Sequence, residues 1–277
     1  MSDHYRAVAS TRRAAALAAT DSPFAIDVRF TGGLTGRQQK AFSRAADRWA
    51  SVIVGDLPSV LVDGETVDDV LILASGSSID GPGQILGQAG PTQLRPASAG
   101  AAALLPAAGR MQFDSADLAQ MEADGTLDDV ITHEMGHVLG IGTLWSRKGL
   151  LAGSGTDDPT FSGAGAVAEY ETLTGAAETG VPVENTGGAG TREGHWRESV
   201  FGTELMSGFI AAAGNPLSRL TVASLRDLGY VVDPEAAEPY SLPAAVAPGE
   251  GAVVAGPGRR CVVGRPATSV LPDSSLR

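Results

Sequence analysis

Apolar and polar positions alternate near the start of the chain and then recur at helical spacing. Over residues 24–30 every second residue is apolar, which predicts a half-buried strand. Thr35 and Gln38 follow as a candidate capping box, which predicts the start of a helix. The apolar side of that helix is formed by Ala41, Phe42, Ala45, Trp49, Val52 and Ile53.

Three further extended segments precede a second helix. Apolar or alternating runs predict strands over residues 70–74, 85–94 and 110–113. Thr126 and Asp129 form another candidate capping box, and Gly140 suits the left-handed residue that ends a helix. The buried side of this short amphipathic helix is predicted to contain Leu127, Val130, Ile131, Val138 and Leu139.

The regular pattern is lost after Gly140. Residues 146–194 are rich in Gly, Thr, Ala and Glu and show little periodicity, apart from a short helix predicted at 167–173. A stretch of this length inside a domain is typical of a functional segment or an insertion. Another short helix is predicted between Leu217 and Gly229.

These patterns divide the chain into three parts. Residues 1–21 are expected to form a mobile leader. Residues 22–233 are expected to form one domain, with an N-terminal subdomain at 22–140 and a C-terminal subdomain at 141–233 that contains the insertion. Residues 234–277 hold seven of the sixteen prolines with much Ala and Gly, and we expect a linker or a disordered tail there.

Composition excludes several classes of protein. With 277 residues, 43% hydrophobic and 19% charged, the chain can bury a sizeable core, and 36 glycines against seven phenylalanines indicate a loop-rich fold. The net charge of −12 argues against nucleic acid or an anionic membrane as a partner, since both need a basic surface. No segment approaches the roughly 18 apolar residues of a transmembrane helix.

The single cysteine, Cys261, excludes an internal disulfide and leaves the redox compartment open. The apolar run at residues 14–19 is too short for a clear signal peptide. The sequence therefore leaves the localisation unknown, and it does not indicate the oligomeric state.

Residues 133–137, HEMGH, carry the strongest chemical signal in the chain. Residues four apart lie on the same face of a helix, so His133 and His137 can bind one metal ion while Glu134 projects to the side. Zinc lowers the pKa of a bound water to about 7, and a neighbouring carboxylate can accept and return the proton. The predicted chemistry is hydrolysis at a zinc ion, with Glu134 as the catalytic base.

A catalytic zinc ion needs three protein ligands and an open fourth position. The remaining histidines are His4, in the expected leader, and His195, at the end of the irregular stretch. His195 is our candidate for the third ligand. A downstream carboxylate is the alternative, and the candidates are Asp157, Glu171 and Glu198.

Residues 133–140, HEMGHVLG, resemble the metzincin zinc peptidases, whose motif is HExxHxxGxxH. Thr143 stands at the last position of that motif, where the family has its third histidine. Leishmanolysin-like metzincins place a large insertion before that histidine, and the stretch from Gly140 to His195 is similar to this arrangement. Residues 204–208, ELMSG, resemble the family's Met-turn, which implies that Met206 lies beneath the metal.

The resemblance implies an α+β, zincin- or metzincin-like fold. In this fold a twisted mixed sheet lies above the active-site helix, and a smaller C-terminal subdomain lies below it. The edge strand that binds an extended substrate would be near residues 110–113. An extracellular location would agree with the resemblance.

We therefore expect a zinc-dependent metalloendopeptidase, a hydrolase with one catalytic Zn²⁺ ion whose substrates are proteins or peptides. His133, His137 and His195 would hold the zinc, Glu134 would assist the attack of zinc-bound water, and residues 22–233 would be the catalytic domain. The alternative is a catalytically inert zinc-containing module for binding or adhesion. Structural zinc sites are usually closed by four Cys or His ligands, and only three histidines lie outside the expected leader, so the open catalytic site is favoured.

Overall fold

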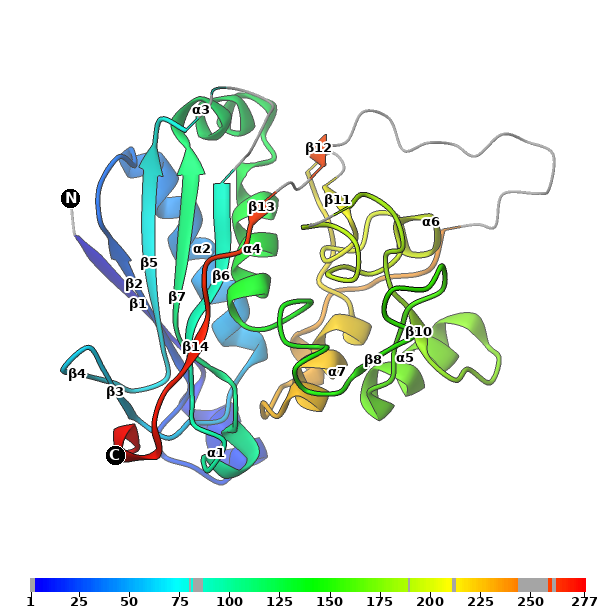
Figure 1. Cartoon of the computed structure of the whole chain (residues 1–277), viewed down its shortest axis with the longest axis horizontal. Coiled ribbons are helices and arrows are strands. Elements are labelled where there is room, and N and C mark those ends of the chain that lie inside the picture. Colours follow the sequence, from blue (N-terminus) through cyan, green and yellow to red (C-terminus); the bar gives the residue numbers. More distant parts are fainter. Residues whose placement is uncertain are drawn as a thin grey trace.

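A mixed β-sheet forms one half of the molecule in the computed structural model (Figure 1). The structure describes residues 3–79, 81, 87–188, 190–210, 213–243, 259–260 and 263–277. Within this part of the chain the sheet has seven strands, in the order β1-β2-β5-β7-β6-β13, with β14 also paired to β6. Their bounds are β1 His4–Val8, β2 Ala25–Phe30, β5 Val70–Ser77, β6 Gly87–Leu94, β7 Pro106–Asp114, β13 Val263–Gly264 and β14 Ser269–Val270.

The directions of these strands explain the mixed character of the sheet. β2, β5 and β7 are parallel to one another, whereas β1 is antiparallel to β2 and β6 is antiparallel to β7. The predicted strands at 24–30, 70–74 and 110–113 correspond to β2, β5 and β7, and β6 covers the described part of the strand predicted at 85–94. β7 lies between β5 and β6, so the expectation that residues 110–113 form an edge strand is wrong.

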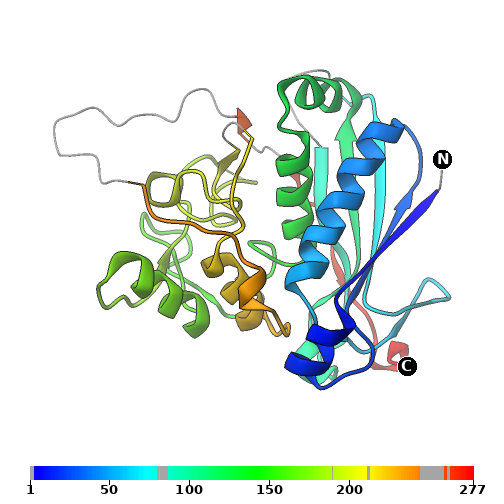
Figure 2. The ribbon, with the colours of Figure 1, turned by 180° about the vertical axis from the view of Figure 1, so that it is seen from behind.

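Two long helices, α2 (Gly36–Val52) and α4 (Leu127–Val138), cover one face of this sheet (Figure 2). The capping box predicted for α2 is confirmed: the Thr35 hydroxyl accepts from the backbone N–H of Gln38 at 3.2 Å, and the Gln38 side chain accepts from the Thr35 N–H at 2.9 Å. Phe42 packs edge-to-face against Phe113 of β7, with ring centroids 5.9 Å apart. The apolar side of α2 therefore joins the sheet to the helical layer.

The capping box predicted for α4 is wrong. Thr126 has a helical backbone and its side chain makes no cap hydrogen bond. The Asp129 carboxylate accepts instead from the backbone N–H groups of Gly214 and Asn215, at 2.7 and 3.2 Å. The Asp129 side chain, which the local sequence assigned to the cap, thus makes a tertiary contact instead.

The elements from β8 to α7, together with β12, form the other half of the molecule (Figure 1). Its helices are α5 (Ala164–Thr174), α6 (Glu198–Phe201) and α7 (Arg219–Leu228), of which the first and last match the helices predicted at 167–173 and 217–229. Its short strands are β8 Leu151–Ala152, β9 Thr160–Phe161, β10 Val181–Pro182, β11 Phe209–Ile210 and β12 Arg259–Arg260. One cluster of buried apolar residues runs from the sheet through α4 into α7, so the two halves share a core.

The remaining elements are peripheral. They are α1 (Thr11–Ala18), the β3–β4 hairpin (Val60–Val62 and Glu65–Val67), α3 (Ser115–Asp124), and the 3₁₀ turns Gly100–Ala102, Pro234–Ala236 and Asp273–Ser275. The hairpin packs with Leu271 and Leu276 in a second, smaller apolar cluster.

Both ends of the chain differ from expectation where the structure describes them. The expected mobile leader contains β1, which pairs with β2, and α1, which begins after the Ser10 cap. Ala7 and Ala9 are buried, while His4 and Arg6 contact Asp27. The expected tail contains β13 and β14, which pair with β6. Cys261 lies outside the described residues.

No helix in the described ranges is both long and apolar enough to span a membrane.

Candidate metal centre

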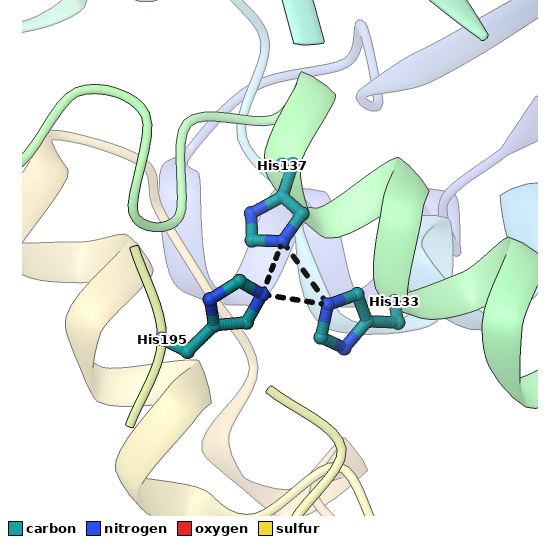
Figure 3. A group of neighbouring side chains, drawn as sticks. All are labelled: His133, His137 and His195. Atoms are coloured by element: carbon teal, nitrogen blue, oxygen red, sulfur yellow. Dashed lines mark hydrogen bonds between the residues drawn. The ribbon is translucent and has the colours of Figure 1, made fainter. Parts of the chain in front are cut away.

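Three histidines converge where α4 meets the second half of the molecule (Figure 3). His133 and His137 project from one face of α4, and His195 comes from the segment between β10 and α6. Their Nε2 atoms form a nearly equilateral triangle: His137 lies 3.0 Å from each of the other two, and His133 lies 3.1 Å from His195. All three rings are buried. The structure thus brings together the three histidines that the sequence singled out.

The second ring nitrogen of each histidine is held by a backbone carbonyl. Nδ1 of His133 contacts the Leu205 oxygen at 2.7 Å, and Nδ1 of His137 contacts the Ile141 oxygen at 2.9 Å. Nδ1 of His195 contacts the Thr191 oxygen at 2.8 Å. A carbonyl can only accept, so each Nδ1 carries the proton and each Nε2 presents a lone pair. Three lone pairs facing one another repel, and a cation between them removes the repulsion.

Burial keeps these rings neutral. It lowers the pKa of His133 to about 4 and that of His195 to about 3. The pKa of His137 is also well below its ordinary value, first because of burial and then because of the neighbouring imidazoles. Neutral imidazole is the form that binds a metal ion, so the protonation state suits ligation.

The spacing of the nitrogens suits zinc. A tetrahedral ion with zinc–nitrogen distances of about 2.0–2.1 Å separates its ligand atoms by roughly 3.3 Å. The observed separations of 3.0–3.1 Å come within a few tenths of an ångström of that value. Three nitrogens with fixed outer hydrogen bonds therefore fit a zinc ion with an open fourth position.

A close backbone contact places His195 at the end of α4. Gly140 follows the helix with a φ of +111°, which confirms the predicted left-handed end. Gly142 then lies directly against the backbone of Gly194: a Cβ on Gly142 would be only 2.6 Å from the Gly194 carbonyl carbon. Thr143, at the last position of the HExxHxxGxxH pattern, donates its hydroxyl to the His137 carbonyl at 2.8 Å. The turn after α4 is thus the surface on which the His195 segment rests.

Met206 packs against α4 at Gly136, the residue before His137. A Cβ on Gly136 would be 2.8 Å from the Met206 sulfur and 2.9 Å from a ring carbon of Trp49, so the side chain passes close under the helix between the two histidines. The preceding residue, Leu205, supplies the carbonyl that holds His133. The turn at residues 205–207 therefore both underlies α4 and orients a metal-site histidine.

Glu204 organises this turn, a role that sequence reasoning missed. Its buried carboxylate accepts from the Met206 N–H at 2.6 Å and from the Ser218 and Thr221 hydroxyls at 2.7 and 2.5 Å. Burial raises its pKa, and these hydrogen bonds oppose that shift. The Thr221 hydroxyl also accepts from the indole N–H of Trp196, beside His195. The signal available in the sequence was an acidic residue, Glu204, directly before the apolar pair Leu205 and Met206.

Two tryptophans join the metal-site segments. The Trp145 and Trp196 rings are fully buried, with centroids 4.7 Å apart. This contact confirms the sequence-based hypothesis that the two indoles pack together. It ties the chain after α4 to the residue that follows His195.

The other candidate ligands lie elsewhere. The Glu198 carboxylate accepts from the Phe209 N–H at 3.2 Å, and that of Glu171 accepts from the Glu178 N–H at 3.1 Å. Asp157 is exposed, and His4 contacts Asp27 on β2 at 2.7 Å. None of these four belongs to the cluster of the three histidines.

An α+β fold in which two histidines of an HExxH helix meet a third, distant histidine defines the class of the protein as a metallopeptidase. A family model described as leishmanolysin matches residues 98–245, more than half of the chain, and the chain belongs to this peptidase family. The matched residues include α4, the long stretch that follows it, His195 and Met206. A comparison with curated proteins gives no match.

Proposed function

We propose that the protein is a zinc-dependent endopeptidase in which Nε2 atoms of His133, His137 and His195 hold one catalytic zinc ion. The observation that carries this proposal is the Nε2 triangle, in which every outer ring nitrogen is held by a carbonyl. Met206 packs against Gly136 of α4, and this contact, which a Met-turn beneath the ligands would require, supports the same proposal. The substrates would be proteins or peptides, as the peptidase family implies.

Glu134 is the proposed catalytic base. It directly follows His133 on α4, and its side chain is fully buried. Bound zinc would acidify a water molecule and polarise the scissile carbonyl. Glu134 would accept a proton from the attacking water and then deliver it to the leaving amine. A positioned base of this kind contributes about 10²–10⁴-fold to the rate.

The decisive experiment measures zinc content and casein cleavage for the unsubstituted chain and for Glu134→Ala. Glu235→Ala is the control, because Glu235 is exposed and far from the site. We expect one zinc ion in all three proteins and cleavage in all but Glu134→Ala. Chelation should abolish the cleavage.

The same experiment separates the two candidate functions. Bound zinc without cleavage in the unsubstituted chain would leave two interpretations, a latent or narrowly selective enzyme or the inert binding or adhesion module. Absence of zinc would refute the metal centre itself.

The third ligand is tested by His195→Ala with Glu198→Gln as its matched control. Loss of a ligand should weaken zinc binding in His195→Ala, whereas Glu198→Gln should keep the affinity of the unsubstituted chain. Unchanged zinc stoichiometry and affinity in His195→Ala would refute the assignment. Weakened binding in Glu198→Gln alone would favour the carboxylate alternative.

A further inference from the structure

The outer edge of β6 is occupied by the C-terminal part of the chain. Val263 and Gly264 of β13 pair in parallel with Gly87 and Gln88, and β14 pairs its two residues with Gln93 and Leu94. Figure 1 shows this segment running along β6 on the side that faces the second half of the molecule. We call residues 263–270 the strap.

The middle of the strap also follows β6. The Pro266 ring lies over Gly90, with its Cδ 3.1 Å from the place of a Cβ on that glycine. The Thr268 hydroxyl donates to the Pro91 carbonyl at 2.8 Å. Beyond the strap, the Leu271 N–H donates to the Leu94 carbonyl at 2.9 Å. The strap therefore covers β6 along its length.

Arg265 extends from the strap to the metal centre. Its guanidinium lies against the backbone of Gly194, the residue before His195, with Cζ 3.6 Å from the place of a Cβ on Gly194. Its positive charge is attracted to the Glu134 carboxylate. The side chain that contacts the residue before His195 therefore comes from the far end of the chain.

The position of the strap matters because extended peptides bind proteins by adding a strand to a sheet edge. β7 already pairs with one edge of β6, so the other edge is the one open to a peptide. β6 also packs against α4, which brings this edge close to the histidines. Backbone groups that pair with the strap cannot pair with a substrate at the same time.

We propose that the strap occupies the substrate position on β6 and holds the peptidase in an autoinhibited state, with Arg265 as its anchor against Gly194. This proposal rests on the proposed function. A substrate can bind only in molecules whose strap has left β6. The apparent kcat/KM is therefore the kcat/KM of the strap-free enzyme multiplied by the fraction of such molecules. If the strap leaves in about one molecule in ten, its release raises kcat/KM about tenfold.

The first test compares Arg265→Ala with Arg277→Ala in the zinc-loaded full chain. Arg277 is an exposed arginine that contacts Ser274 and Leu276 and lies outside the strap. We expect Arg265→Ala to raise kcat/KM for casein-derived peptides about tenfold. It should also speed hydrogen exchange of the β6 amides, and Arg277→Ala should do neither. Unchanged exchange and cleavage, or slower cleavage, in Arg265→Ala would overturn the proposal.

The second test locks the strap reversibly. Gln93 and Ser269 are partners across β6 and β14, so Gln93→Cys with Ser269→Cys in a Cys261→Ser background can form a disulfide between them. The oxidised protein should bind zinc but cleave at least about tenfold more slowly than the same protein reduced with a phosphine, which breaks the disulfide. The Ser269→Cys single variant in that background should not respond to the reductant.

The outcomes separate this proposal from the proposed function. Equal cleavage by the oxidised and reduced forms would overturn the strap proposal and leave the peptidase intact. Bound zinc without cleavage in any variant, reduced or carrying Arg265→Ala, would refute the peptidase and the inhibitory role together. An intact mass after incubation supports an inhibitor, whereas cleavage within residues 263–270 would make the strap a substrate and overturn the proposal.

Discussion

Replacing Gly142 by alanine tests how the His195 segment is held against the end of α4. The new Cβ would lie 2.6 Å from the carbonyl carbon and 2.8 Å from the Cα of Gly194. Carbon atoms in contact are about 3.5–4.0 Å apart, so the two backbones must separate by roughly 1 Å. His195, the next residue, moves with Gly194.

Gly149 supplies a matched control. Gly142 and Gly149 have the same φ of +69°, but a Cβ on Gly149 has nothing within 4 Å. The left-handed backbone costs about 1–2 kcal/mol in either alanine variant. The overlap at Gly142 adds about 1–3 kcal/mol, which is the usual cost of forcing an extra group into a packed site.

Zinc affinity should separate the two variants further. A displacement of roughly 1 Å exceeds the tolerance of about 0.2 Å on a zinc–nitrogen distance. We expect zinc affinity to fall about 100-fold in Gly142→Ala, which is the upper end of the effect of mutating groups that orient metal ligands. Gly149→Ala should keep the zinc affinity of the unsubstituted chain. Titration against a competing chelator measures the affinity, and urea unfolding measures the stability. Equal values for the two variants in both measurements would refute the reasoning.

Three further predictions concern the same region. The zinc-free protein should lose stability in urea unfolding as the pH falls from about 6.5 to about 4, because the unfolded chain binds protons on His133 and His195 that the buried rings do not take up. Glu204→Gln should lower the free energy of unfolding by about 1–3 kcal/mol in urea titrations, since an amide NH₂ cannot accept a hydrogen bond from the Met206 N–H or from the Ser218 and Thr221 hydroxyls. Trp145→Ala should lower it by about 3–5 kcal/mol in the same assay by leaving a cavity beside Trp196.

Each of these has a contradicting result. A flat stability profile between pH 6.5 and 4 would show that the rings titrate normally in the folded state. Glu235→Gln, at an exposed position, is the control for Glu204→Gln, and equal unfolding energies for the two would contradict the role of Glu204. A loss below about 1 kcal/mol in Trp145→Ala would show that the two indoles are not a packing unit.

Local patterns in the sequence predicted the elements whose signals are themselves local. The capping box at Thr35 and the apolar spacing that follows it both lie within α2, and both were confirmed. At α4 the same reasoning failed, because Asp129 bonds to Gly214, far along the chain. A short polar side chain near a helix start can serve either partner, and only the tertiary fold decides between them.

The convergence of the three histidines could be anticipated from coordination chemistry, but the contacts that support them could not. The need for a third ligand beside His133 and His137 pointed to His195, and the structure places the three residues together. The contact between Gly142 and Gly194 and the hydrogen bonds of Glu204 join residues that no periodic pattern relates. These supports emerge only when distant segments are brought together in space.

The predictions for the two ends of the chain differ from the structure for a related reason. β1 buries one small residue, Ala7, rather than large apolar residues, so its hydrophobic signal is weak, and its partner β2 lies beyond α1. β14 has two residues, and its partner β6 lies in the first half of the chain. Short strands of this kind are defined by what they pair with.

The contact between Gly142 and Gly194 has a consequence for how chain length can vary in this peptidase. Because the two glycines touch, the roughly fifty residues between them form a closed loop whose ends are fixed next to the metal-site histidines. The entropy of closing such a loop grows only logarithmically, so doubling its length costs about 0.6 kcal/mol. Residues can therefore be gained or lost at its exposed tip around Gly175 without shifting His195. The long stretch that separates His137 from His195 is thus a place where new surface can be added while the three histidines keep their arrangement.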